Sequence, residues 1–406
     1  MRALQEAGVK IDLVAGHGIG AGSAALAAID GSARLWDENG VWRSSQIRRL
    51  YRWKRSAQTV AAAAVASVSI LVGLPVYLIL GGAGLPSITV IIAAIAIAIL
   101  ALVGAAVAAM ARRDAPSQRR PRGAWFWRVA GAPLDATSAG ELFSSAIWEV
   151  IRGAAPAQRP TRTELGRRYS EALAENLGQP GFRELLLVVN DLEARRDTVA
   201  AVLREPYRQQ FFAPRVDRDR RSDVVDLAGI GRDHTLDVIA AAMTPPLLCD
   251  PAGVTFAADS YWKGETHRMC DRPGAMYRLL EEAAAAGVSQ AIVVSAVSQV
   301  SAPHGLRVPR ADLRARLGDF QSSAEAAALR DAFEMARLRF DSVHLITPAY
   351  NPLGPFDIGG AYDQASDRRQ SLSELMHSGY EDAYRQFIEP VVGASGEQLA
   401  SVSVPK

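Results

Sequence analysis

Two patterns of hydrophobic and polar positions take turns along the chain. Short apolar runs rich in Val, Ile and Leu predict buried strands at residues 11–15, 185–189, 291–295 and 343–347. Apolar residues at spacings of three and four predict helices at 163–177, 275–286, 324–339 and 371–388. Strands without a polar face are typical of parallel sheets covered by helices. The pattern therefore predicts an α/β fold with buried, parallel strands.

Two long apolar stretches interrupt this pattern. They run from Ala57 to Leu80 and from Ile88 to Ala111, each about 24 residues without a charge. About 20 residues suffice for a helix to cross roughly 30 Å of hydrocarbon. Residues 81–87 between them are rich in glycine and proline, which favours a tight reversal. The two stretches therefore predict a transmembrane hairpin.

Basic residues flank both stretches. They are Arg48, Arg49, Arg52, Lys54 and Arg55 on one side and Arg112, Arg113, Arg119, Arg120 and Arg122 on the other. Because cytoplasmic flanks are rich in Lys and Arg, we expect an integral membrane protein, of a bacterial inner membrane, whose soluble domain faces the cytoplasm. The hairpin is then an insertion at 51–122 between two parts of one domain, 1–50 and 123–400.

The composition and charge of the chain argue against several classes of function. The 406 residues carry a net charge of +2, and no basic face suggests a nucleic acid partner. Two cysteines, Cys249 and Cys270, do not form the pattern of a disulfide framework or a zinc site. Glu265, His267, Cys270 and Asp271 match no established ligand spacing, and we interpret them as a solvated loop. The sequence indicates no metal and no cofactor.

The strand predicted at 11–15 leads into a glycine-rich turn. Its residues are Gly16, His17, Gly18, Ile19 and Gly20, and an alanine-rich helical segment follows. A strand, a tight glycine turn and a helix form the nucleophile elbow GxSxG of many hydrolases. Here Gly18 occupies the serine position, so the turn offers no hydroxyl group.

With these residues the chain resembles the patatin-like phospholipase family. Residues 4–16 and the turn after them are similar to that family's first helix, strand and elbow. Met243, Thr244, Pro245 and Pro246, followed by 250–259, resemble its proline-containing loop and the turn before its catalytic aspartate, and 287–294 resembles the next strand. The resemblance implies a three-layer α/β fold with a central, mostly parallel sheet. It also implies a lipid acyl hydrolase with a Ser–Asp dyad and a glycine-rich oxyanion loop.

This chain departs from that pattern at three points. Gly18 replaces the serine, the oxyanion loop would precede Met1, and the aspartate turn reads Asp259, Ser260, Tyr261. Asp259 is then the one catalytic side chain that the resemblance carries over. The alternative is that Asp259 is a turn residue that bonds to its own backbone. Since the nucleophile and the oxyanion donors each supply several kcal/mol, ordinary dyad chemistry is not expected.

Two functional hypotheses remain open. The first is a non-catalytic relative that binds membrane lipids with little or no hydrolysis. The second is an active lipid acyl hydrolase that uses an unrecognised nucleophile or an oxyanion loop from a longer N-terminus. His17 is a candidate base or nucleophile, and Ser23 lies too far around the helix, about 140° from Gly18 at roughly 100° per residue. A second glycine turn at 357–363, with Asp357, Asp363 and Asp367, is interpreted as a loop.

Overall fold

The structure is a computed structural model. It describes residues 1–80, 86–111, 132–213, 221–260, 262–297, 313–349, 351, 362–363, 368–369 and 372–393. Two compact units are present, one of residues 1–51, 136–246 and 251–406, the other of residues 52–135 and 247–250. The expected loop at 357–361 and the basic residues Arg112 to Arg122 lie outside the described residues.

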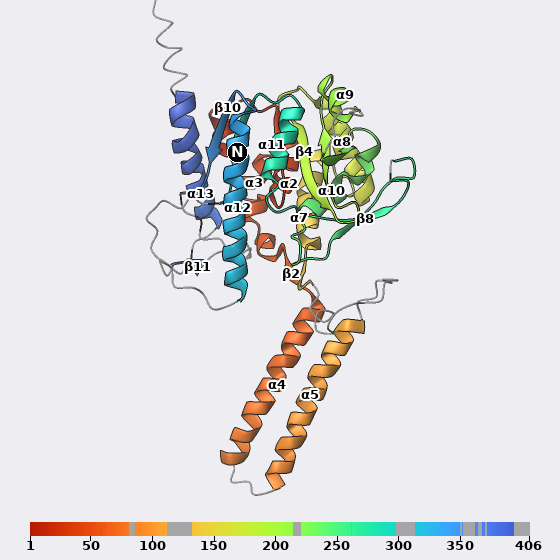
Figure 1. Ribbon diagram of the computed structural model, residues 1–406, viewed down its shortest axis with the longest axis vertical. Coiled ribbons are helices and arrows are strands. Elements are labelled where there is room, and N and C mark those ends of the chain that lie inside the picture. The colour runs from red at the N-terminus through yellow and green to blue at the C-terminus, as the bar shows by residue number, and fades with distance from the viewer. Residues whose placement is uncertain are drawn as a thin grey trace, which may run out of the picture. The chain divides into compact units, whose positions relative to one another are not determined.

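The larger unit is built on a mixed sheet (Figure 1). Its strands follow the order β6 (Ser222–Asp226), β5 (Arg196–Val202), β4 (Glu184–Asp191), β8 (Thr266–Cys270) and β7 (Ala252–Thr255), and β1 (Leu13–Gly16) also pairs with β4. The pairs β1–β4 and β5–β6 are parallel, whereas β4–β5, β4–β8 and β7–β8 are antiparallel.

The prediction of a mostly parallel sheet is therefore wrong. Residues 192–195, with Arg195 at φ 56°, connect β4 directly to β5. A parallel pair needs a crossover of about a dozen residues, so this short connection enforces a hairpin. The strands β9 (Gln290–Val294) and β10 (Ser342–Ile346) are parallel as expected, but they form a separate sheet.

Helices cover both faces of β4. Leu185, Leu187 and Val189 belong to a core shared with α2 (Gly20–Ala28), α7 (Thr137–Arg152), α8 (Arg162–Asn176) and α10 (Thr235–Ala242). Leu186 and Val188 belong to a second core with α9 (Tyr207–Phe212) and α11 (Met276–Ala285). The alternation along β4 follows from the period of two in a strand.

The remaining described helices complete this unit. They are α1 (Arg2–Glu6), α3 (Ala33–Trp36), α12 (Leu313–Arg337), α13 (Leu372–Ala383) and the π-helix Tyr384–Gly393, with short 3₁₀ turns at Val41–Arg43, Ser45–Arg49 and Ile230–His234. The predicted helices at 163–177, 275–286, 324–339 and 371–388 all fall on observed helices. The two-residue strands β11 (Tyr362–Asp363) and β12 (Arg368–Arg369) pair with each other.

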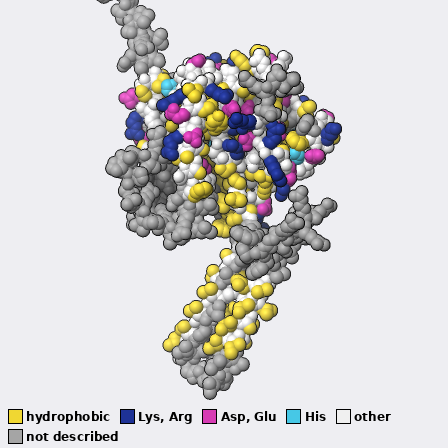
Figure 2. All heavy atoms as spheres, viewed as in Figure 1, with side chains coloured by type: hydrophobic (Ala, Val, Ile, Leu, Met, Phe, Trp, Pro, Cys, Tyr) yellow, Lys and Arg dark blue, Asp and Glu magenta, His cyan; other side chains and the backbone are white. Residues whose placement is uncertain are grey.

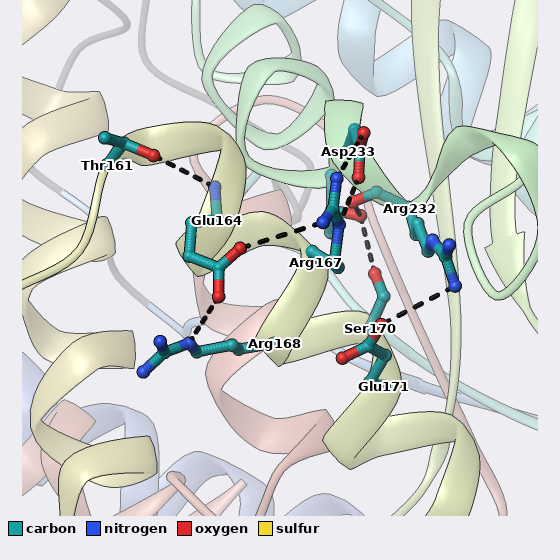
Figure 3. A network of polar contacts seen from close by, with 9 residues as sticks. Thr161, Glu164, Arg167, Arg168, Ser170, Glu171, Arg232 and Asp233 are labelled. Atoms are coloured by element: carbon teal, nitrogen blue, oxygen red, sulfur yellow. Dashed lines mark hydrogen bonds and ion pairs between the residues drawn. The ribbon is translucent and has the colours of Figure 1, made fainter.

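Ion pairs fasten α8 to the segment that leads into α10 (Figure 3). The Thr161 hydroxyl accepts a hydrogen bond from the Glu164 amide at 3.3 Å and caps the helix. Arg167 donates Nε and Nη2 to the two oxygens of Asp233 at 2.8 and 2.9 Å. This bidentate contact fixes the beginning of α10, whose end contributes to the site described below.

The smaller unit contains two long helices, α4 (Arg55–Leu80) and α5 (Pro86–Ala111). The Ser67 hydroxyl donates to the Ala98 carbonyl at 3.1 Å, so the helices pack against each other. The strands β2 (Arg52–Trp53) and β3 (Leu134–Asp135) pair antiparallel. Large hydrophobic side chains are exposed along both helices, among them Val68 and Leu100 (Figure 2).

Within the described residues, no helix combines the length and the apolar character that crossing a membrane requires. The prediction of transmembrane spans from Ala57 to Leu80 and from Ile88 to Ala111 is thus contradicted, and with it the integral membrane location. That prediction rested on the length of the two stretches and on their lack of charged residues. Many of these positions are alanine, which has a single methyl group, and each buried carbon contributes only about 0.8 kcal/mol. Gln58, Thr59, Ser67 and Ser69 further dilute the apolar character of α4.

Candidate active site

The topology of β4 brings two distant segments together. One edge of β4 pairs with β5, so β1 and β8 share the other edge. β1 runs parallel to β4 and ends with Gly16 opposite Leu187, whereas β8 runs antiparallel and ends with Cys270 opposite Asn190. The carboxyl ends of β1 and β8 therefore meet along the same edge. The turn after Gly16 and the residue after Cys270 lie at this meeting point.

The turn after β1 is close and connects the strand directly to a helix. A Cβ atom at Gly16 would lie 2.7 Å from the Gly20 carbonyl oxygen, closer than any side chain permits. Gly18 has φ +55°, the left-handed conformation that glycine adopts without strain. The chain then enters α2 at Gly20. The sequence thus folds locally as a strand, a close turn and a helix.

Asp271 is the carboxylate that faces this turn. The Gly18 amide donates to its Oδ1 at 2.9 Å. A Cβ atom at Gly18 would lie 3.3 Å from Oδ2, so a side chain at position 18 would touch the carboxylate. The Asp271 side chain is 18% exposed.

Asp259, the aspartate predicted from the resemblance, lies in the segment between β7 and β8. It is exposed in a turn in which the Ser260 amide donates to the Ala257 carbonyl at 3.0 Å. No described contact joins Asp259 to the elbow. Sequence reasoning missed Asp271 because it was grouped with a charged loop. Its signal was its position, directly after the short run 266–270 and before a Pro-Gly turn.

His17 is the second polar side chain at the elbow. Its Nδ1 lies 3.6 Å from Asp271 Oδ1, which is beyond hydrogen-bond distance. This nitrogen is buried and has no hydrogen-bond partner in the described structure, while the His17 side chain as a whole is 26% exposed. Ser23 is half-buried on α2, and no described contact links it to Asp271. His17 and Asp271 are thus the ionisable pair at the turn.

Buried hydrogen bonds and ion pairs hold Asp271 in place. Its amide donates to the Thr244 carbonyl at 2.8 Å, just after the end of α10. Its neighbour Arg272 contacts Asp197 Oδ1 at 2.7 Å, and Arg278 contacts Oδ2 of the same carboxylate at 3.2 Å. Asp197 and Arg278 are both buried. The loop after β8 is therefore anchored to α10, β5 and α11.

The candidate metal ligands do not form a site in the described structure. His267 pairs with Asp191 at 2.5 Å, and Cys270 is a buried thiol whose pKa is raised by burial. Across the described residues, no group of three His, Cys, Asp or Glu side chains is placed to hold a metal ion.

Comparisons with protein-family models, with curated proteins and with solved structures found no match for this chain. The functional argument therefore starts from the geometry of the elbow.

Proposed function

We propose that this chain is a non-catalytic relative of Ser–Asp acyl hydrolases, which binds an acyl lipid at the elbow without hydrolysing it. One observation carries the proposal. The position at which an elbow presents its nucleophile faces the Asp271 carboxylate, and that position is Gly18. This contact supports a dyad-like arrangement in which the attacking group is missing. Without it, the acyl transfer step loses a contribution worth several kcal/mol.

The choice of an acyl lipid as ligand rests on the resemblance to patatin-like phospholipases. The turn retains the close glycines that such an elbow requires, at Gly16 and Gly18. These positions need glycine for backbone reasons, so they preserve the shape of the elbow even without catalysis. The shape of the turn therefore does not depend on a catalytic group, and it is compatible with binding as the function.

A second candidate function is hydrolysis that depends on His17. Its Nδ1 is buried without a partner, 3.6 Å from Asp271 Oδ1. A small rotation of the ring would complete a hydrogen bond, and the other ring nitrogen would then act as a general base on water. This observation favours an active enzyme with water as nucleophile.

Both candidates are tested with the purified full chain. We expect the parent protein to resist a fluorophosphonate probe and to leave a p-nitrophenyl ester intact, but to bind a pyrene-labelled long-chain acyl ester. Gly18→Ser should become labelled, because its Oγ would lie beside Asp271, although φ +55° costs a non-glycine residue about 1 kcal/mol. Gly18→Ser combined with Asp271→Asn should lose this labelling.

The controls separate the two candidates. Ester turnover by the parent that disappears in His17→Gln and persists in Ser23→Ala would support the His17 enzyme and refute the non-catalytic function. If the parent neither binds the pyrene ester nor turns over an ester, both candidates fail.

A further inference from the structure

We infer that His267, held by Asp191, is a proton-dependent positioning residue that fixes the β7–β8 hairpin and thereby Asp271. The inference goes beyond lipid binding, because it concerns how the hairpin is held whatever the ligand is. His267 is the second residue of β8, and Asp271 directly follows that strand. The two residues are thus four positions apart on one rigid element, about 13 Å along a strand.

Asp191 forms the fixed side of the contact. It ends β4 and is fully buried. Its Oδ1 accepts the amides of Glu193 at 2.9 Å and Ala194 at 3.0 Å, and its Oδ2 contacts His267 Nδ1 at 2.5 Å. Because Asp191 already accepts two amides through Oδ1, we take it as the acceptor of the His267 contact as well, with Nδ1 as the donor.

The other side of His267 contacts the loop of the hairpin. Its Nε2 lies 3.4 Å from Glu265 Oε2, and the imidazole centroid lies 4.4 Å from that of Trp262 and 5.3 Å from that of Phe256. Only a protonated imidazole donates from both nitrogens. Protonated His267 thus connects the end of β4 to the loop before β8.

The surrounding charges favour the proton. Asp223 on β6 has one buried oxygen without a described partner, and its other oxygen lies 3.3 Å from Arg196. The His234 ring also contacts Phe256, and its Nε2 accepts the Ala257 amide at 3.2 Å. The carboxylates of Asp191, Glu265 and Asp223 interact electrostatically with His267.

These contacts determine the direction of the pH response. Burial alone would lower the pKa of His267, but the hydrogen bonds and charges of Asp191 and Glu265 together raise the pKa above its ordinary value. A histidine whose pKa is higher in the folded protein than in the unfolded chain stabilises the fold. This stabilisation is complete below the pKa of the unfolded chain, about 6.5. This stabilisation is lost as the pH rises through the folded pKa. The hairpin should then loosen, and the Asp271 contact with Gly18 should weaken.

The test is made on the full chain by NMR and hydrogen exchange. The imidazole resonances of the six histidines are titrated and His267 is assigned with His267→Gln. Protection of residues 252–271 and of the Gly18 amide is then measured between pH 6 and 9, normalised to intrinsic exchange rates. We expect His267 to titrate above pH 6.5 and protection to fall at least tenfold through the same pH range. Asp191→Asn should move the titration to lower pH.

His377→Gln is the matched control. His377 is exposed on α13 and lies 3.3 Å from Glu381, so its loss should leave the hairpin unaffected. If His267→Gln does not fold, His267 is assigned in the parent protein by triple-resonance NMR, and the titration of the parent still decides. A His267 pKa at or below 6.5, or hairpin protection that stays constant as His267 titrates, would overturn the inference.

Discussion

Gly22 lies where α2 packs most closely against α7. A Cβ atom at this position would lie 2.6 Å from Cδ1 and 2.7 Å from Cγ of Phe143. Ordinary van der Waals contact begins at 3.4 Å, so the ring would have to move by about 0.8 Å. Phe143 is fully buried and its ring centroid lies 6.2 Å from that of Trp42. The ring therefore has little space into which it can move.

Gly22→Ala should consequently destabilise the fold. Overpacking of a buried site costs about 1 to 3 kcal/mol. Alanine is a better helix former than glycine by about 1 kcal/mol, which offsets part of this cost. We expect a net loss of about 1 to 2 kcal/mol in the free energy of unfolding, measured by urea denaturation followed by far-UV circular dichroism.

Gly20→Ala is the control within the same helix. Gly20 is exposed, and a Cβ atom there would meet nothing within 4 Å. This variant should be as stable as the parent or slightly more stable. In a Phe143→Leu background, Gly22→Ala should lose most of its cost, giving a coupling of about 1 kcal/mol. An unchanged midpoint for Gly22→Ala, or an equal cost in both backgrounds, would refute the argument from close packing.

Three further predictions concern single side chains. Tyr169→Phe should lower the free energy of unfolding by about 1 kcal/mol, measured by urea titration, because the buried hydroxyl donates to the Ala25 carbonyl at 2.8 Å. Arg167 holds the pKa of Asp233 below its ordinary value. The ion pair therefore stabilises the fold above the unfolded pKa of about 3.9, and this stabilisation is lost as the pH falls through the folded pKa. Asp233→Asn should reduce the loss of stability at acidic pH, measured by melting curves at a series of pH values. Burial raises the pKa of the Cys249 thiol to about 12, so iodoacetamide should alkylate it at pH 8 at least tenfold more slowly in the folded protein than in urea, as judged by mass spectrometry.

Local patterns in the sequence predicted individual elements well. The apolar runs at 185–189 and 343–347 are strands, and the amphipathic segments at 163–177 and 275–286 are helices. The glycines from Gly16 to Gly20 predicted a close turn between a strand and a helix, and the structure has that turn. These features depend on side-chain periodicity and backbone freedom, which are properties of neighbouring residues.

Features that depend on distant residues were not predicted. The sheet is mixed because short connections at 192–195 and 256–265 form hairpins, and β5 to β8 were not recognised as strands. The long apolar stretches showed where two helices pair, but length and absence of charge did not decide whether those helices cross a membrane.

The sequence by itself determined that position 18 carries no nucleophile, because this follows from the identity of one residue in a recognisable turn. Only the tertiary structure decided which carboxylate faces that turn. Gly18 and Asp271 are 253 positions apart, and they meet because β1 and β8 approach each other along one edge of β4. Strand pairing of this kind depends on the register of the strands and on which edge of β4 is free. Neither can be predicted from the residues that are neighbours in the sequence.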